Sequence, residues 1–242
     1  MTVYYDGSFE GFLTLIYEKY YQKLNIEKII KEFPNSLFDD EILEIKTDIQ
    51  KASKVLNSLK QKFSKSNFST ITNTFLCDCI DFELDLLKFI IVGFKNQKQL
   101  TNINLDCVNN LALYAHQMGR YIHRYYAFTR FQETKEGILY ATIETDFNII
   151  YFLGRHFFKR LNNQNFIIHD LKRQVAFIKF DQKTSIENVS SYEIPEFSDD
   201  EQKFQKLWKV FFKSVSIESR ENLKLQQQQV PLIYREFMTE FH

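Results

Sequence analysis

Residues 128–144 read FTRFQETKEGILYATIE, and within them the hydrophobic period of the chain changes from 3.6 to 2. Alternating apolar residues on both sides of the central glycine predict two antiparallel strands joined by a turn. A second hairpin is predicted from NFIIHD and VAFIKF, residues 165–170 and 175–180, with residues 171–174 at its tip. Residues 148–161 lie between the hairpins and have helical spacing. The sequence therefore predicts a small antiparallel sheet of hairpins packed with helices.

The part of the chain before this sheet has mostly helical spacing and one short two-stranded element. Residues 2–5 read as a strand, and Ser8 is placed to cap the helix that follows. Residues 41–46 predict a second strand that pairs with the first. The predicted fold class is α+β, with a mostly helical part over residues 1–103 and an α+β part with C-terminal helices over residues 104–242. One continuous domain is the alternative.

The C-terminal helices begin with a capping box, in which Ser198 precedes Glu201 by three residues. An apolar stripe at helical spacing follows, formed by Phe204, Leu207, Trp208, Phe211, Phe212 and Val215. Because such a stripe is normally covered, we expect this helix to pack on the part of the chain that precedes it.

Positive charge is concentrated in one segment of a neutral chain. Lys plus Arg and Asp plus Glu each total 31, so no global field draws the protein to nucleic acid or membrane. Residues 116–180, however, carry four Lys and six Arg against five acids, together with four of the five histidines. Any anionic partner is therefore expected at this segment.

Composition and missing motifs exclude several classes of protein. The three cysteines are too few and too irregularly spaced for a secreted disulfide framework, and no apolar run is long enough to cross a membrane, so we expect a cytoplasmic protein. No phosphate-binding loop, nucleophile elbow or dinucleotide fingerprint is present. His116 and His123 lie about 10 Å apart along a helix, too far for one ion. No cofactor or metal is predicted.

The basic residues of this segment are candidates for binding the phosphates of DNA. Helical spacing over residues 105–126 places Arg120 and Arg124 on a polar face, away from the apolar residues. The full set of candidates is Arg120, Arg124, Arg130, Arg155, Lys159, Lys172 and Arg173. The alternative is that these cations form internal ion pairs with nearby acids, namely Glu133, Glu144, Asp146 and Asp170.

Three acids are weak candidates for catalysis. Glu144, Asp146 and Asp170 follow predicted strands, where the metal ligands of nucleases often lie. Lone acids at strand ends also commonly cap a turn or pair with arginine, so both interpretations stay open.

Several stretches together resemble a bacterial family of unknown function that is described as probable DNA metabolism proteins. They are YYDGSFEGFL at 4–13, HRYYAFTRFQE at 123–133, YATIETDFNII at 140–150, HFFKRL at 156–161, IIHDLKR at 167–173 and LWKVFFKSVSIESRENLKLQQQQVPLIY at 207–234. Genes of that family commonly lie beside one for a radical-SAM protein of DNA modification or repair, and related domains are fused to uracil-DNA glycosylases.

The resemblance implies a DNA-binding or accessory protein of a DNA modification or repair system, with DNA and the radical-SAM protein as partners. We expect a protein that is not itself an enzyme. The alternatives are an enzyme that acts directly on DNA, as a metal-dependent nuclease or by base excision, and a purely structural interaction protein.

Overall fold

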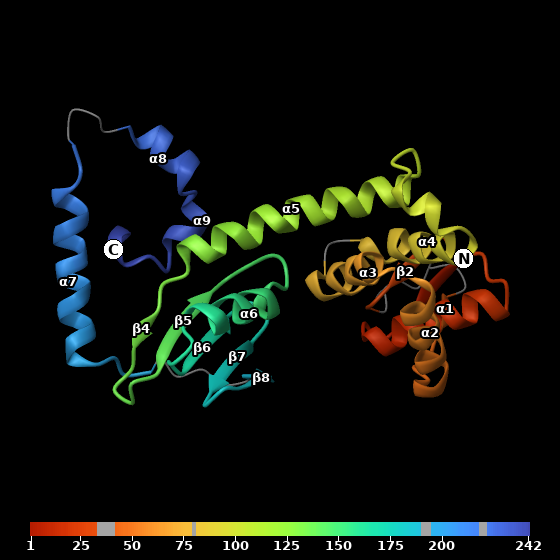
Figure 1. Ribbon diagram of the computed structural model, residues 1–242, viewed down its shortest axis with the longest axis horizontal. Coiled ribbons are helices and arrows are strands. Elements are labelled where there is room, and N and C mark those ends of the chain that lie inside the picture. The colour runs from red at the N-terminus through yellow and green to blue at the C-terminus, as the bar shows by residue number, and fades with distance from the viewer. Residues whose placement is uncertain (33–41, 79–80, 190–194, 218–221) are drawn as a thin grey trace. The chain divides into compact units, whose positions relative to one another are not determined.

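The computed structural model describes residues 1–32, 42–78, 81–189, 195–217 and 222–242. The chain divides into two units, residues 1–118 and 119–242, and the division falls inside helix α5 (Asp106–Phe128) (Figure 1). The boundary predicted between residues 103 and 104 lies shortly before this helix.

The first unit contains a parallel three-stranded sheet. Its central strand is β1 (Thr2–Tyr4), flanked by β2 (Lys28–Ile30) and β3 (Ile42–Glu44). The predicted pairing of the first strand with residues 41–46 is confirmed for β3, and residue 41 lies outside the described residues. The predicted element of two strands is corrected to three, because β2 has only three residues and too short a pattern to be recognised.

Helices form the rest of the first unit. Helix α1 (Phe9–Tyr21) begins at its predicted cap, where the Ser8 hydroxyl accepts a hydrogen bond from the Gly11 amide at 2.9 Å. Three more helices precede α5: α2 (Ile49–Lys62), α3 (Lys65–Cys77) and α4 (Phe82–Lys95), followed by the 3-10 helix η1 (Gln97–Thr101). Their apolar faces meet in a core that includes Phe12, Leu15, Leu59, Ile71, Leu86 and Ile90.

The second unit contains a five-stranded sheet in the order β4-β5-β6-β7-β8. The strands are β4 (Gln132–Glu133), β5 (Leu139–Ile143), β6 (Phe166–Asp170), β7 (Val175–Phe180) and β8 (Lys183–Asn188). Both predicted hairpins are confirmed, as the antiparallel pairs β4–β5 and β6–β7. The sequence pattern missed β8, whose residues are all exposed and therefore show no apolar alternation.

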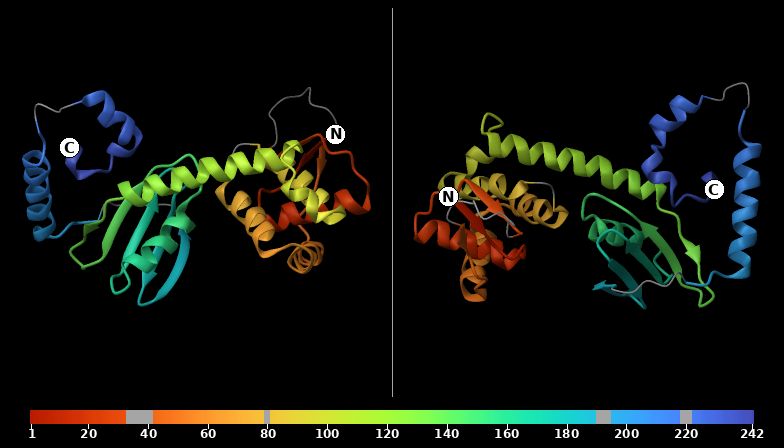
Figure 2. Two further views of the ribbon diagram at one scale, coloured as in Figure 1. Left: turned by 45° about the horizontal axis from the view of Figure 1, so that its top comes forward. Right: turned by 180° about the vertical axis from the view of Figure 1, so that it is seen from behind.

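The expectation of an antiparallel sheet is wrong for one pair of strands, because β5 and β6 run parallel. Helix α6 (Ile150–Arg160) makes the crossover between them and lies against the sheet (Figure 2). Its closest approach is at Gly154, where an added Cβ would lie 2.2 Å from the ring of Phe177. The buried amine of Lys179 donates to three carbonyl oxygens in the segment after α6, at 2.7 to 3.4 Å.

The chain ends in helices α7 (Asp199–Ser214), α8 (Leu223–Gln229) and α9 (Leu232–Arg235) and the 3-10 helix η3 (Thr239–Phe241). The predicted cap is confirmed, since the Ser198 hydroxyl accepts from the Glu201 amide at 3.1 Å.

The expected burial of the apolar stripe on α7 is not observed. No residue of α7 is buried, and Phe204 and Leu207 are 67% and 64% exposed. The stripe contacts the C-terminal 3-10 helix η3, where Phe212 packs edge-on against Phe241 and the Trp208 indole N–H donates to Glu240 at 3.2 Å. Within the described residues, no helix has the length and apolar character needed to cross a membrane.

Candidate functional site

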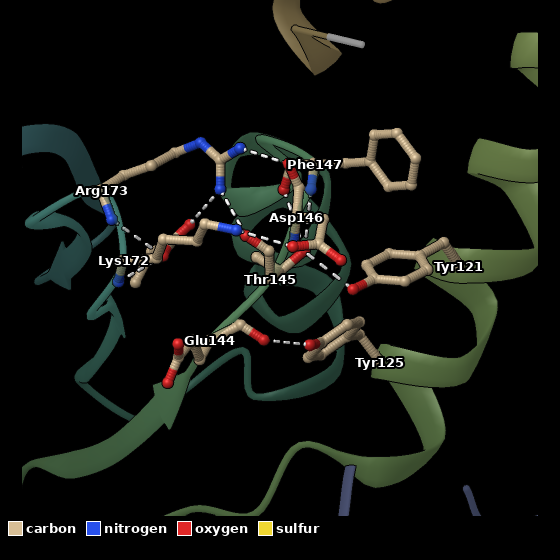
Figure 3. A network of polar contacts seen from close by, with 9 residues as sticks. Tyr121, Tyr125, Glu144, Thr145, Asp146, Phe147, Lys172 and Arg173 are labelled. Carbon is tan, nitrogen blue, oxygen red and sulfur yellow. Dashed lines mark hydrogen bonds and ion pairs between the residues drawn. The ribbon is translucent and has the colours of Figure 1, made fainter. Parts of the chain in front are cut away.

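The parallel pairing of β5 and β6 brings the loops that follow them to one edge of the sheet. There the Arg173 guanidinium donates to the carbonyl oxygens of Thr145 and Asp146, at 2.7 and 2.6 Å, and to the Asp170 carboxylate at 3.3 Å (Figure 3). One side chain therefore joins the two loops. The predicted acids Glu144, Asp146 and Asp170 and the predicted cations Lys172 and Arg173 all lie in this loop network.

Asp170 is the buried centre of the loop network. Its side chain has no exposed surface, and Oδ1 accepts hydrogen bonds from the amides of Lys172 and Arg173, at 3.1 and 3.2 Å. Burial raises the pKa of Asp170, and the adjacent Arg173 opposes that rise. The carboxylate oxygens thus bond to the turn that follows β6, which is a structural role.

Lys172 and Asp146 form a second ion pair in the loop network, with 2.6 Å between Nζ and Oδ1. The two side chains are 49% and 65% exposed, so water competes with the pair and its contribution to stability is small. This pair holds the two loops together only weakly.

Two tyrosines of α5 complete the loop network (Figure 3). The buried Tyr125 hydroxyl donates to the carbonyl oxygen of Glu144, and burial raises the pKa of that tyrosine. The Tyr121 hydroxyl accepts from the Asp146 amide at 3.4 Å, and its ring meets the edge of Phe147. These rings are therefore engaged in packing and in holding the loop.

Arg130 forms a largely buried ion pair with Glu240, close to the C-terminal end of the chain. Its guanidinium contacts both carboxylate oxygens of Glu240, at 2.7 and 3.4 Å, and the Glu240 side chain is only 4% exposed. Burial acts to raise the pKa of Glu240, but the hydrogen bond from Arg130 holds it below the ordinary value. The predicted acid partners of the cations did not include Glu240, which is 110 residues away in the sequence.

Arg124 lies beside the Tyr234 hydroxyl. Burial raises the pKa of this tyrosine, and the hydrogen bond from Arg124 opposes the rise. The Tyr234 ring also meets the edge of the Tyr125 ring, with 5.0 Å between centroids. Arg124 is therefore partly committed to packing the chain terminus against α5.

The remaining predicted cations are free of such commitments. Arg120 on α5 and Arg155 and Lys159 on α6 are exposed, and none forms an ion pair with any acid in the described parts of the chain. Arg160, which the sequence analysis did not select, is also exposed on α6. The sequence signal that could have identified Arg160 is its position directly after Lys159.

Helices α5 and α6 are joined inside the second unit by two aromatic side chains. The rings of Tyr126 and His156 stack with 3.8 Å between centroids and 11° between planes. Burial lowers the pKa of His156, and the nearby Arg160 lowers it further. Helix α6, on which Arg155 and Lys159 are exposed, thus contacts the C-terminal half of α5. We use the name basic helix face for the three exposed cations of these two helices, Arg120, Arg155 and Lys159.

Residues 81–240 match a family described as a domain of unknown function, DUF4130. The chain belongs to this family. The matched region contains the whole loop network and the basic helix face, and it begins after the three-stranded sheet. A comparison with curated proteins gives no match. Within the described DUF4130 residues, no three His, Cys, Asp or Glu side chains lie close enough together to hold a metal ion.

Proposed function

We propose that the chain is a DNA-binding accessory protein of a DNA modification or repair system that works with a radical-SAM enzyme. The observation that carries the DNA-binding part is the basic helix face. Exposed cations without an acid partner can bind phosphate oxygens without first breaking an ion pair. Arg130, Lys172 and Arg173 are less suited to this role, because each is already paired with a carboxylate.

The loop network supports a structural interpretation of Asp170 better than a catalytic one. Asp170 is enclosed, and its oxygens already accept three hydrogen bonds. A catalytic carboxylate must reach substrate, water or metal, and Asp170 has no exposed surface from which to do so. We therefore place DNA binding above direct catalysis on DNA.

The binding test is a salt titration with a fluorescent 20-base-pair duplex and the full chain. Replacing Arg120, Arg155 and Lys159 with Gln should weaken binding similarly for all sequences. The slope of log affinity against log salt should shrink by roughly one unit for each lost phosphate contact, up to about three. The control carries the same charge change at exposed positions elsewhere in the second unit, Lys183, Lys206 and Lys213. Equal slopes in the two variants would refute the proposal.

The partner part of the proposal rests on the family resemblance and on the exposed stripe of α7. Exposed apolar side chains in a row are typical of surfaces that bind protein. Replacing Phe204 and Phe211 with Ser should abolish co-purification with a radical-SAM protein of the kind that the family resemblance implies as a partner. The control is Phe180→Ser on β7, where the ring is 55% exposed. Undiminished co-purification of the α7 variant would count against this surface.

A further inference from the structure

The first unit has a pocket of about 650 Å³ between α1, α2 and α4. These helices are labelled in Figure 1. Pockets of this size accommodate small ligands or part of a longer chain. The pocket does not involve the basic helix face or the loop network, and it lies before most of the DUF4130 region.

Lysines dominate the polar lining of this pocket. They are Lys19, Lys23, Lys54, Lys62 and Lys95, and we call them the lysine ring. Within the described residues, the lining contains no Asp or Glu, and no lysine of the ring forms an ion pair. The nearest buried acid of α1, Glu18, is already paired with Lys51 at 2.6 Å. The pocket is therefore a concentrated positive site in a part of the chain whose total charge is close to neutral.

Aromatic rings occupy the same pocket. Tyr20 and Tyr21 are 75% and 65% exposed, although both rings carry large apolar surfaces. Tyr17 stacks on Tyr21 with 4.2 Å between centroids, which extends the aromatic surface into the pocket. Lys54 lies 5.9 Å from the Tyr17 ring and Lys62 lies 5.5 Å from Phe94. The rings and the cations thus line the same pocket.

Stabilisation of helix ends explains only some of these lysines. Lys19, Lys62 and Lys95 lie in the last turns of their helices, where a cation interacts favourably with the helix dipole. Lys54 lies in the middle of α2 and gains nothing from this effect. Lys23 follows α1 with φ at 54°, a left-handed conformation that favours glycine.

We propose that this pocket binds the nucleotides of a single-stranded nucleic acid. Unpaired bases can stack on Tyr20 and Tyr21, and the lysine ring can contact consecutive phosphates. A duplex keeps its bases stacked inside and offers nothing to the exposed rings. A free mononucleotide carries a charge of about −2, too little to match the lysine ring even without Lys19, whose amine donates to the Leu24 carbonyl oxygen. An acidic peptide would pair with the lysines and leave the rings without a function.

This inference goes beyond the DNA binding proposed for the second unit and does not rest on it. The test uses the full chain and a labelled dT12 strand, with a 12-base-pair duplex and dTMP as competitors. We expect dT12 to bind more tightly than either competitor. Replacing Tyr20 and Tyr21 with Leu should weaken dT12 binding at least tenfold, because the bases lose the rings on which they stack. Replacing both with Phe, which keeps the rings, should retain it.

The lysine ring is tested by salt dependence. Lys54→Gln with Lys62→Gln should reduce the slope of log affinity against log salt by about 1.4 units, at about 0.7 per phosphate on a single strand. The control is Lys60→Gln with Lys65→Gln, two exposed lysines outside the pocket lining. No dT12 binding, equal competition by the duplex or dTMP, or indifference to the pocket variants would each overturn the inference.

The same assay separates the two proposals. The variant of Arg120, Arg155 and Lys159 should lose duplex binding and keep dT12 binding, whereas the pocket variants should do the reverse. If the second-unit variant alone abolishes dT12 binding, the pocket is not the site of the single strand.

Discussion

Lys172 and Arg173 are adjacent cations in one turn, and we predict that replacing each with Met has very different consequences. Arg173→Met removes the partner of a carboxylate with no exposed surface, together with hydrogen bonds to the carbonyl oxygens of Thr145 and Asp146. Lys172→Met removes one ion pair between side chains that are about half exposed. Both substitutions remove one positive charge, so the difference between their effects on stability measures the effect of burial.

The expected magnitudes follow from that difference. Breaking a buried ion pair by removing one partner costs about 3–5 kcal/mol, because the remaining charge stays desolvated. Arg173→Met should therefore lower the melting temperature by roughly 6 to 20 °C, at about 2–4 °C per kcal/mol for a chain of this size. Lys172→Met should leave the melting temperature nearly unchanged, because its ion pair is exposed to water.

The cost of Arg173→Met should also depend on pH. Burial raises the pKa of Asp170, so its carboxyl binds a proton more readily in the folded state. The stability that this group contributes is complete below its unfolded pKa and is lost as pH rises through the folded pKa. Removing Arg173 raises the folded pKa further, so the variant should approach the wild type near pH ~4 and fall behind it toward pH ~7.

Urea unfolding of both variants at several pH values measures these differences. Combining Arg173→Met with Asp170→Asn should cost less than the sum of the two single changes by about 1 kcal/mol or more, because the double variant has no buried unpaired charge. If Arg173→Met were no more destabilising than Lys172→Met, or if the two changes were additive, the structural role assigned to the loop network would be wrong.

Three further predictions concern the packing of the second unit. Gly154→Ala should destabilise the protein by about 1–3 kcal/mol in thermal melts, because the added Cβ would overlap the ring of Phe177. Gly119→Ala has open space around it and should stabilise α5 by about 1 kcal/mol. Equal melting temperatures of the two variants would contradict the close contact at Gly154. Lys179→Met should lower the urea midpoint by the equivalent of about 1–3 kcal/mol, since three carbonyl oxygens lose their donor, and an unchanged midpoint would show that water replaces the amine. Burial lowers the pKa of His156, so the stability that this residue contributes is complete above its unfolded pKa and is lost as pH falls through its folded pKa. His156→Phe should therefore flatten the dependence of the unfolding free energy on pH between pH ~7 and pH ~5. An unchanged pH dependence would assign the effect to other groups.

The sequence predicts the local elements well where a single residue or a short pattern decides them. Ser8 and Ser198 cap helices as expected, because a hydroxyl at that position needs only an amide three residues later. The hairpin of β6 and β7 is likewise a local structure, with its tip where predicted.

Features that depend on distant residues could not be predicted in this way. The parallel pairing of β5 and β6 depends on the path of α6, which a pattern of period 2 does not encode. The partner of Arg130 is 110 residues away, so the search for nearby acids missed Glu240. The pocket of the first unit was also not predicted, because its lysines come from segments that are far apart in the sequence.

Helix α5 links the structural and the proposed binding role within the second unit. Tyr125 holds the Glu144 carbonyl from one side of this helix, while Arg120 is exposed to solvent on it. Damage to the loop network can therefore displace the helix and weaken DNA binding without removing any phosphate contact. Arg173→Met is the critical comparison. Its effect on binding should disappear when affinity is expressed per folded molecule, and its salt slope should equal that of the wild type. A reduced slope in folded Arg173→Met protein would instead mean that this arginine exchanges Asp170 for a phosphate when DNA binds.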